Sequence, residues 1–498
     1  MSKTHDATIL GLDIGTSAVK AVLVDLRQFV LASISVPLST QRPKPGWSEQ
    51  EADNWVLATC TALAGLKSRA PETFANVRAI GLSGQMHGAV LLGVDDRPLR
   101  PAILWNDSRA EAECAEMLAA LPDLPLIAGV PPMPGLTAPK LLWLKKHEPD
   151  NFAAISSVLC PKDFVRLFLT GDRCTDMSDA AGTLWLDEAH RDWSATALAA
   201  SGLTVAQMPR LIEGIAISGE VSPKLCAEFG WPPGVIVAGG AGDAAAAAIG
   251  LGATNEGDAF ISLGTSCQVF ATSAHYRPRP ETLVHAFAHC VPDRWFQMAA
   301  MLNGASCLSW VASALGRSDI DGLLHEVAKA YQGPEDLLFL PYLSGERTPH
   351  NDAAARGVFF GLYPSTTSAN MTQAVLEGVA YSIAQARLVL AEAGMLLNEV
   401  AVTGGGTRNA FWLQIISDVT GLALVRYDGT ELGPAFGAAR LARVALTGET
   451  VDSVCLKPAA KDRFVPDPAK ADGYAAGFER YLHLYTALKP EFRRAAMR

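Results

Sequence analysis

The segment TILGLDIGTSAVKAVLVD, residues 8–25, decides the fold of this 498-residue chain. Its apolar first half carries one carboxylate, Asp13, and stops at Gly15-Thr16-Ser17 before a second apolar run begins. This pattern predicts a β-hairpin with a glycine and two hydroxyl side chains at its tip. A buried ionised aspartate costs several kcal/mol unless it is paired. Asp13 is therefore either satisfied within the structure or faces a positive charge.

The same turn recurs in GDAFISLGTSCQVFATS, residues 257–273, where Leu263-Gly264-Thr265-Ser266 aligns with residues 14–17. A glycine at such a tip lets backbone N–H groups gather around an anion. Two copies favour two similar domains, each offering a phosphate-binding turn to a shared cleft, although four shared residues also arise by chance. Asp13 is replaced by Ser262 in the second copy. One carboxylate beside bound phosphates suits Mg²⁺.

Length and composition set the class of protein. A chain of 498 residues with 49% hydrophobic and 18% charged residues supports two domains with sizeable cores. The net charge of −10, without a basic run, argues against nucleic acid as a partner. The N-terminus lacks the pattern of a secretory signal. Nine scattered cysteines, none in a C-x-x-C pair, predict reduced thiols and a cytoplasmic protein.

One stretch could be taken for a membrane span. Residues 235–253, VIVAGGAGDAAAAAIGLGA, are rich in glycine and alanine but carry Asp243 near the centre, where a charge is costly in lipid. We predict a strand, a turn and the start of a helix here, and no membrane partner. Asp243 then lies at a helix N-terminus, where the dipole favours a carboxylate. It is either an N-cap or the group that accepts a proton from a substrate hydroxyl.

Strand and helix patterns alternate along the rest of the chain and predict an α/β fold with largely parallel sheets. A strand is expected at 77–84 and a helix at 371–392. The domain boundary is expected near 252–257, giving domains 1–253 and 254–498. An aromatic stripe predicts a buried face on the last helix, which is expected to pack back on the first domain; its members are Tyr474, Phe478, Tyr481 and Tyr485.

Three further segments carry polar groups or glycines next to strands. TGGGTRN, residues 403–409, is either a tight turn or part of a nucleotide site, and it matches neither the Rossmann nor the P-loop spacing. LSGQMHG, residues 82–88, places polar side chains after a buried strand, where α/β folds bind ligands. HAFAH, residues 285–289, has i,i+4 histidines without the zinc-protease glutamate, so we expect a strand and no metal site.

These segments, together with PKPGWSEQEADNW, ILWNDSRA and LPYLSGERTPH, resemble the FGGY family of carbohydrate kinases in order along nearly the whole chain, and its xylulokinases above all. The resemblance implies two ribonuclease-H-like domains of the actin, hexokinase and Hsp70 type, with ATP and a sugar in the cleft between them. It also implies an ATP- and Mg²⁺-dependent transfer of phosphate to a ketopentose, D-xylulose first.

The resemblance assigns roles residue by residue. Asp243 is implied to be the base, and Asp13 to organise Mg²⁺ with it. The sugar is implied to contact Gln85, Met86, His87, Trp105, Asn106 and Asp107 beside Asp243. ATP is implied to contact the two turns and the glycine run, namely Gly15, Thr16, Ser17, Lys20, Gly264, Thr265, Ser266, Gly404, Gly405, Gly406 and Asn409. Lys20 is equally well explained as a solvated side chain. A homodimer is expected from the resemblance alone.

One departure bears on the substrate. Xylulokinases commonly have Asp-Asn at the start of the catalytic helix, whereas this chain has Asp243-Ala244. Losing the Asn removes a hydrogen-bond partner, typically ~1 kcal/mol net. The alternatives left open are an FGGY kinase for ribulose, fuculose, arabinitol, erythritol or glycerol, and a non-catalytic actin-like ATP-binding protein. A transcriptional regulator is disfavoured because no basic helix-turn-helix segment is present.

Overall fold

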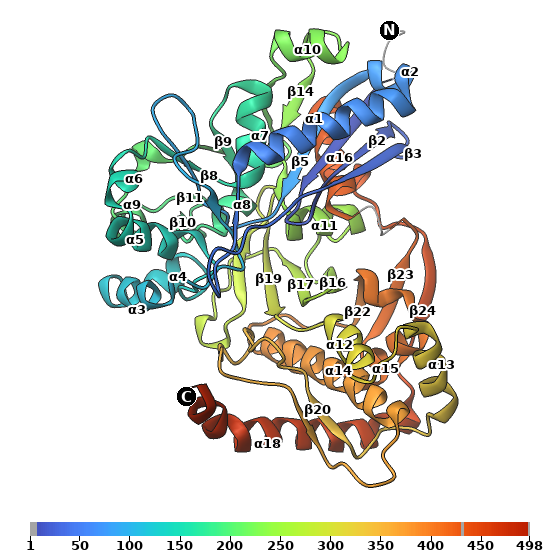
Figure 1. Cartoon of the computed structure of the whole chain (residues 1–498). Coiled ribbons are helices and arrows are strands. Elements are labelled where there is room, and N and C mark those ends of the chain that lie inside the picture. Colours follow the sequence, from blue (N-terminus) through green and yellow to red (C-terminus); the bar gives the residue numbers. More distant parts are fainter. Residues whose placement is uncertain (1–6, 430–432, 497–498) are drawn as a thin grey trace.

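The computed structural model describes residues 7–429 and 433–496. Residues 1–6, which begin the N-terminal segment discussed above, lie outside the described residues. The chain forms two seven-stranded sheets, one in the upper and one in the lower part of Figure 1, with helices packed on each. The expected two-domain α/β class is therefore confirmed.

The first sheet contains the first hairpin. Its strands run in the order β13 (Ile217–Glu220), β14 (Ile236–Ala238), β5 (Val77–Gly84), β1 (Thr8–Ile14), β2 (Ala18–Asp25) and β3 (Val30–Pro37), with β15 (Ala241–Gly242) also paired to β5. The second sheet contains the second hairpin. Its order is β18 (His285–Ala288), β19 (Trp295–Met301), β17 (Cys267–Ser273), β16 (Ala259–Leu263), β22 (Glu399–Thr403), β23 (Ala423–Tyr427) and β24 (Ala460–Phe464).

Both sheets are mixed, which corrects the expectation of largely parallel sheets. In the first sheet β1 pairs antiparallel with β2 and parallel with β5. In the second sheet β16 pairs antiparallel with β17 and parallel with β22. The physical reason lies in the connections, because a short turn can only join antiparallel strands, whereas a helical crossover joins parallel ones. The two predicted hairpins and the strand at 285–288 are confirmed.

Two helices lie between the sheets and pack against residues of both. Helix α11 (Asp243–Leu251) follows β15, and helix α16 (Gly433–Thr447) comes from the second half of the chain but packs on β1 and β5 of the first sheet (Figure 1). Their own contact is so close that a Cβ on Gly437 would lie 1.8 Å from Ala246 O. A Cβ on Gly81 of β5 would likewise lie 1.8 Å from Ala438 O. Glycine is therefore required at both crossings.

The other face of the first sheet is covered by α1 (Ala52–Arg69) and α7 (Pro161–Thr170). The second sheet is covered by α12 (Ser306–Ala314), α13 (Ile320–Ala330), α14 (Ser368–Glu392) and α15 (Ala410–Thr420). Among the described residues, α14 is the one helix long and apolar enough to cross a membrane, and most of its apolar window is buried in this core. The stretch 235–253 forms β14, β15 and α11, as predicted.

The last helix corrects another expectation. Helix α18 (Ala471–Ala496) packs on α15, α14 and β20 (Leu338–Leu340), not on the first sheet (Figure 1). Its aromatic stripe is buried as predicted, with Tyr481 fully enclosed and its hydroxyl 2.7 Å from that of Tyr342. The segment that returns to the first sheet is α16, because its glycines and alanines allow the close approach that bulky tyrosines prevent.

Candidate active site

The first turn, Gly15–Ser17, is held in place by buried side chains beneath it. Thr16 Oγ1 donates to Gln85 Oε1 at 2.8 Å, and Trp105 Nε1 donates to Thr16 Oγ1 at 3.0 Å. Gln50 Nε2 donates to the Thr16 carbonyl at 2.7 Å. These contacts fix both the side chain and the backbone of the turn. Its N–H groups therefore keep one orientation, as an anion site requires.

The second turn, Gly264–Ser266, is held mainly through its carbonyls. Ala305 N donates to Gly264 O, and Ser306 Oγ donates to Thr265 O, each at 2.7 Å. The glycine run after β22 packs directly against this turn. A Cβ on Gly404 would lie 2.6 Å from Leu263 O, and Gly404 has a φ of +96°, so only glycine fits. The second turn and the glycine run thus form one continuous backbone surface.

Asp13 lies near the end of β1 and is 7% exposed. It sits opposite Lys20 across the hairpin, and Ser83 Oγ donates to its Oδ1 at 3.2 Å. Burial raises the pKa of Asp13 to about 6, partly offset by Lys20 and Ser83. Within residues 7–429 and 433–496, no basic group lies within ion-pair distance of this carboxylate. The carboxylate is therefore only partly satisfied by the protein.

Asp243 is the first residue of α11, as predicted. The N–H of Ala244 donates to its Oδ1 at 2.7 Å. Burial, and after it the negative charge of Asp13, raises the pKa of Asp243 to about 7. The two carboxylates therefore act on each other across the floor of the cleft. A carboxyl group with a pKa near neutrality is suited to accept a proton.

The loop that leads to Asp243 is fixed by buried side chains from α7 and α8 (Met177–Ala181). Arg166 donates to both backbone carbonyls of residues 238–239, with Nη1 at 2.7 Å from the first. Ser178 Oγ accepts the N–H of Gly242 at 3.0 Å. Since Gly242 precedes Asp243 directly, these contacts set where α11 begins and where its first carboxylate points.

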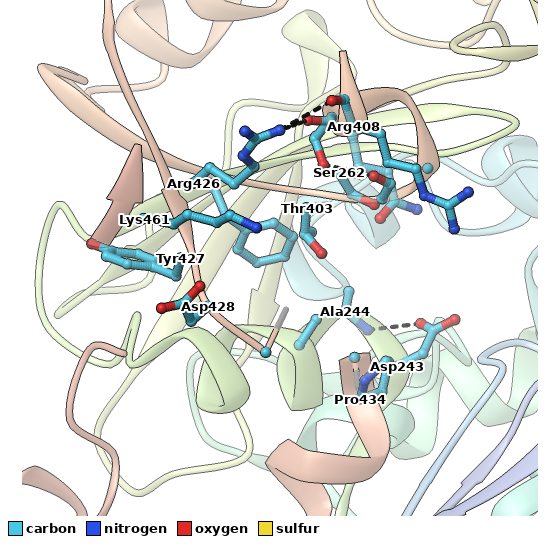
Figure 2. Close-up of a pocket in the computed structure, with 18 of the residues that line it drawn as sticks. Asp243, Ala244, Ser262, Thr403, Arg408, Arg426, Tyr427, Asp428, Pro434 and Lys461 are labelled. Carbon is cyan, nitrogen blue, oxygen red and sulfur yellow. Dashed lines mark hydrogen bonds between the residues drawn. The ribbon is translucent and has the colours of Figure 1, made fainter. Parts of the chain in front are cut away.

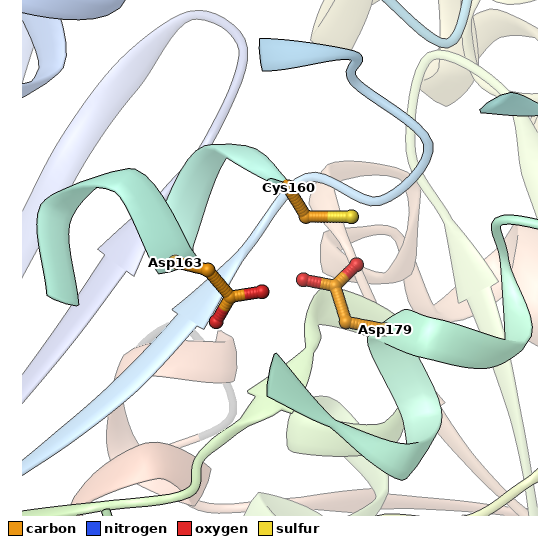
Figure 3. Close-up of side chains that lie close together, drawn as sticks. All are labelled: Cys160, Asp163 and Asp179. Atoms are coloured by element: carbon orange, nitrogen blue, oxygen red, sulfur yellow. The ribbon is translucent and has the colours of Figure 1, made fainter. Parts of the chain in front are cut away.

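A buried ionic cluster supports Ser178 and Arg166. The ammonium of Lys162 lies 2.7 Å from Asp163, 2.9 Å from Asp176 and 3.0 Å from Asp179, all fully buried. Cys160, Asp163 and Asp179 converge within 4.8 Å, a spacing that suits a metal ion (Figure 3). The ammonium of Lys162 already supplies the positive charge for these carboxylates. The cluster is therefore structural. It holds Asp176 in place, and Asp176 in turn orients Ser178 by accepting a hydrogen bond from its Oγ.

A cavity of about 260 Å³ opens beside Asp243. Its lining comes from both halves of the chain and consists of Thr16, Met86, His87, Trp105, Asp243, Ala244, Ser262, Gly264, Ser266, Gln268, His285, Met298, Ala300, Met301, Leu302 and Arg347. Three of the predicted sugar-contacting residues, Met86, His87 and Trp105, are thus brought to one space with the predicted base. Its size and mixed polar lining suit a small polyhydroxylated ligand.

The other three predicted sugar residues lie behind this wall. Gln85 is 2% exposed, and its amide donates to Gln50 while its carbonyl accepts from Thr16. Asp107 is buried in an ion pair with Arg109 at 2.7 Å. Asn106 does not line the cavity. The resemblance to xylulokinases pointed to these residues, but both segments are irregular turns, and the side chains of Gln85 and Asp107 are directed to buried partners instead of the cavity.

His87 is held in one protonation state. It adopts a φ of +69°, and its Nδ1 lies 2.8 Å from the carbonyl of Gly182. Burial lowers its pKa to about 3, so the ring is neutral. The carbonyl acceptor fixes the proton on Nδ1 and leaves Nε2 as a hydrogen-bond acceptor. Lys140 Nζ donates to the His87 carbonyl at 2.7 Å and holds the backbone from behind.

Two larger cavities lie on either side of the glycine run. One, of about 550 Å³, extends from Asp243 past Lys20 and Gly404 to a basic wall (Figure 2). The other, of about 840 Å³, is lined by Gly264, Thr265, Ala305, Ser306, Leu308, Ser309, Ile320, Asp321, Leu324, Gly405, Gly406, Arg408, Asn409 and Trp412. Gly405 and Arg408 line both. Asn409 also caps α15, since its Oδ1 accepts the N–H of Trp412 at 2.9 Å.

The basic wall of the first of these cavities contains side chains that the sequence did not single out. Figure 2 shows Arg408, Arg426 and Lys461 around Thr403 and Ser262, with Asp243 and Pro434 on the opposite side. Arg426 is already engaged, because it pairs with Asp462 and donates to the carbonyl of Thr407. Gly15 and Ser17 line none of these three cavities, and Ser17 is exposed.

The sequence analysis did not identify two other residues that line the 260 Å³ cavity, His285 and Arg347. His285 was set aside as part of a strand, which it is, but its ring lines the cavity. Arg347 belongs to the segment GERTPH and reaches the cavity from the second half of the chain. The available signal was a charged residue shortly after a buried strand, β20, which ends at Leu340.

The arrangement combines the parts needed to transfer a phosphoryl group to an alcohol. Two fixed backbone turns offer N–H groups to phosphates, and a carboxylate of near-neutral pKa adjoins a small polar cavity. A second carboxylate, Asp13, stands beside the first. Positioning and electrostatic stabilisation account for most of the catalysis in this class of reaction.

Comparison with known proteins agrees with this geometry. The N-terminal domain of the FGGY family of carbohydrate kinases matches residues 8–250, and the C-terminal domain of the family matches residues 259–446. The xylulose kinase of Escherichia coli K12 is 43% identical over 97% of this chain and 99% of its own.

Solved structures give the same result. A structure from Brucella ovis, named a xyloylose kinase, is 45% identical with a TM-score of 0.94 over 97% of this chain and 99% of that one. The xylulose kinase of Rhodospirillum rubrum is 30% identical with a TM-score of 0.89 over 98% and 100%. With both family domains matched in order around one cleft, the chain belongs to the FGGY family of carbohydrate kinases.

Proposed function

We propose that this protein transfers the γ-phosphoryl group of ATP to O5 of D-xylulose, giving D-xylulose 5-phosphate. The observation that carries the proposal is the placement of Asp243, at the start of α11, on the wall of a sugar-sized cavity between the two turns. The full-length similarity to xylulose kinases supports the choice of substrate. Ala244 lines the same cavity, at the position where xylulokinases commonly have Asn, so the substrate panel below also tests whether alanine is tolerated there.

Asp243 acts as the base in this proposal. Its carboxylate accepts the proton of the sugar hydroxyl as the new O–P bond forms, while the bond from the γ-phosphorus to the β–γ bridging oxygen breaks and ADP leaves. The first and second turns hold the phosphates in line with that hydroxyl, and Ser262, Gln268 and Thr16 line the space between. Because the cavity is enclosed by both halves of the chain, bound sugar displaces water from the reacting phosphate.

The two carboxylates also fit a divalent cation. Burial raises the pKa of both Asp13 and Asp243, the charge of Asp13 raises that of Asp243 further, and neither carboxylate makes an ion pair with another of the described residues. Mg²⁺ is commonly held by one or two carboxylates together with phosphate oxygens. We assign Asp13 as its principal holder, with Asp243 beside it. The ion supplies charge neutralisation for the phosphates when it is bound.

ATP is assigned to the clefts around the glycine run. The 840 Å³ cavity, with Gly406, Asn409 and the apolar Leu308 and Leu324, suits adenosine. The phosphates then pass between Gly264-Thr265 and Gly404-Gly405 toward Asp243. Lys20 lines the 550 Å³ cavity on the phosphate side. Gly15, Thr16 and Ser17 form the opposite phosphate turn.

The sugar is assigned to Met86, His87 and Trp105. Gln85, Asn106 and Asp107 act behind them: Gln85 positions Thr16, and Asp107 anchors Arg109 and accepts the N–H of Ser48. We retain 1–253 and 254–498 as the proposed domain limits, with α16 returning to the first sheet. The homodimer and the cytoplasmic location stay predictions.

The test is sugar-dependent ADP release with Mg²⁺-ATP across a panel of D-xylulose, L-xylulose, both ribuloses, L-fuculose, xylitol, D-arabinitol, erythritol and glycerol. We expect D-xylulose to give the highest kcat/KM. Phosphate on O5 of the product, identified by NMR, distinguishes the proposed acceptor from other hydroxyls. A higher kcat/KM on another member overturns the substrate but keeps the kinase. Product formation that persists without Mg²⁺ overturns the assigned cation.

A further inference from the structure

The far wall of the sugar cavity carries an unpaired positive charge. Arg347 lines this cavity, yet its guanidinium makes no hydrogen bond or ion pair with any residue in the described part of the chain. Next to it, His285 is fully buried, and both of its ring nitrogens lack a partner there as well. Arg347 is half-buried, and although the charge of Glu346 acts on it, a cation partly withdrawn from water without a hydrogen-bond acceptor is costly. Such a cation, together with an unsatisfied imidazole, marks a place where a ligand supplies acceptors.

The backbone of Arg347 is held in place. Its N–H donates to Glu346 Oε1 at 2.8 Å, and the same oxygen accepts the N–H of Leu302 at 2.7 Å. Thr348 donates its N–H to Ala300 O at 3.1 Å. These contacts fasten residues 346–348 to the end of β19. The guanidinium is therefore presented to the cavity from a fixed base, which reduces the entropy lost on binding.

Arg347 lies near His87 and His285, and its charge contributes to lowering the pKa of both rings after burial. Its Nη2 lies 3.7 Å from the point that a Cβ on Gly135 would occupy, and the Gly135 carbonyl shares Lys140 with that of His87. Burial and then Arg347 lower the pKa of His285, whereas burial and then Asp13 raise the pKa of Asp243. Arg347 thus belongs to the His87 and His285 end of the cavity.

The chemistry of a ketopentose indicates which part of the substrate lies at the His87 and His285 end of the cavity. A 2-ketopentose closes into a ring only by attack of O5 on C2. When O5 is free to accept phosphate, the sugar is open and its C2 carbonyl is exposed. With O5 at Asp243, the carbonyl end of the extended chain faces the opposite end of the cavity. A guanidinium fork donates two parallel N–H groups, which suits a carbonyl oxygen and a neighbouring hydroxyl.

We propose that Arg347, with His285 beside it, binds the carbonyl end of the open-chain ketose and sets the preference for ketoses over the corresponding polyols. This inference rests on the proposed function. It assigns substrate recognition to the second half of the chain, which otherwise holds the nucleotide. Sugar binding then joins the two sheets across the cleft, because His87 and Arg347 come from opposite sides.

The test compares D-xylulose with xylitol, which has the same carbon chain with the carbonyl reduced. Dissociation constants are measured by titration calorimetry without ATP for the wild type, Arg347→Met and Arg347→Lys. We expect Arg347→Met to weaken D-xylulose binding roughly 10- to 100-fold, the loss of a charged hydrogen bond. Xylitol binding should weaken less than about threefold, since the discriminating acceptor is absent. Arg347→Lys should fall between, because it keeps the charge but not the fork.

Kinetics and a matched control separate recognition from folding. The loss should appear in KM more than in kcat, because the carbonyl does not react. Arg356→Met, an exposed arginine of the same segment, should change neither. Melting temperature and ADP affinity should be unchanged or higher for Arg347→Met. Equal losses for both sugars, a loss confined to kcat, or no loss at all would overturn the inference.

The two proposals fail in different ways. A wild type that phosphorylates another ketose better than D-xylulose overturns the proposed substrate, and the comparison is then made with that ketose and its reduced polyol. Only the ratio between ketose and polyol, in Arg347→Met against wild type, decides the role of Arg347. A wild type that prefers a polyol over every ketose overturns both.

Discussion

The two hairpins of this kinase share a backbone and differ in chemistry. Each ends in Gly-Thr-Ser and pairs with a parallel strand at the same side, β5 for the first and β22 for the second. The first has Asp13 where the second has Ser262. The first is held through the Thr16 side chain by buried amides, whereas the second is held through its carbonyls and lies against glycines.

The difference shows how a repeated fold becomes an asymmetric site. Negative charge is concentrated near the first hairpin, where the charge of Asp13 raises the pKa of Asp243. Around the second turn the lining consists mostly of backbone, hydroxyl and amide groups, together with the basic side chains Arg408 and Arg347 and with Asp321 at the nucleotide side. The proposed function therefore assigns both the cation and the base to one side of the phosphates. The other side offers donors that hold the nucleotide without competing for protons.

The largest effect is expected from the base. Asp243→Asn should lower kcat by about 10²- to 10⁴-fold, the usual contribution of a general base. ADP affinity should stay within about threefold, because the nucleotide is held mainly by the second half of the chain. Steady-state kinetics and calorimetry measure both. Asp472→Asn, in the first turn of α18, is the matched control and should be silent. Lost ADP binding with a lowered melting temperature would instead make Asp243 structural.

The next effect tests the asymmetry itself. Asp13→Asn should lower kcat/KM by about 10- to 100-fold and raise the Mg²⁺ concentration needed for half-maximal rate. Its counterpart Ser262→Ala should cost only a few-fold, about the value of one neutral hydrogen bond. A Mg²⁺ titration of both variants makes the comparison. Similar losses with unchanged Mg²⁺ dependence would show that the two hairpins contribute equally.

The pH profile offers a third test. Asp243 accepts a proton only when ionised, and its pKa is raised to about 7. The kcat/KM of the free enzyme should therefore rise about tenfold per pH unit below 7 and level off above it. In Asp13→Asn the neighbouring negative charge is gone, so the midpoint should move to lower pH. A midpoint near pH 4 in the wild type would contradict the shared environment of the two carboxylates.

The smallest effect concerns the supports. Ser178→Ala leaves the Gly242 N–H without its partner in a buried site and removes one of the hydrogen bonds to Asp176, so it should cost about 1–3 kcal/mol of unfolding free energy, with a several-fold lower kcat. Ser178→Thr, which keeps the hydroxyl, should restore most of both. On the second turn, Ser306→Ala removes an exposed contact and should cost less than about 1 kcal/mol. Denaturant titration and kinetics compare the two variants, and equal costs would contradict the expectation that the buried support of the Asp243 loop contributes more than the exposed support of the second turn.

Local patterns predicted much of the site. The apolar runs on either side of Gly15 and Gly264 specified both hairpins, and the glycines before Asp243 specified a helix start. These features depend on neighbours in sequence, so spacing alone reveals them. The mixed sheets were not foreseen, because parallel and antiparallel pairing depends on which distant strands meet. The direction of the Gln85 side chain could not be read from the sequence for a related reason, since it depends on contacts with Gln50 and Thr16.

The sequence by itself determined the repeated turns, the two carboxylates and the family to which the chain belongs. Only the tertiary structure decided what these groups face. Helix α16 crosses the first sheet because Gly81 and Gly437 allow contact at backbone distance, and that crossing sets the two sheets around one cleft. The same packing brings Arg347 to the cavity of His87. Such contacts between segments that are distant in sequence follow from packing in three dimensions, which local sequence patterns do not reveal.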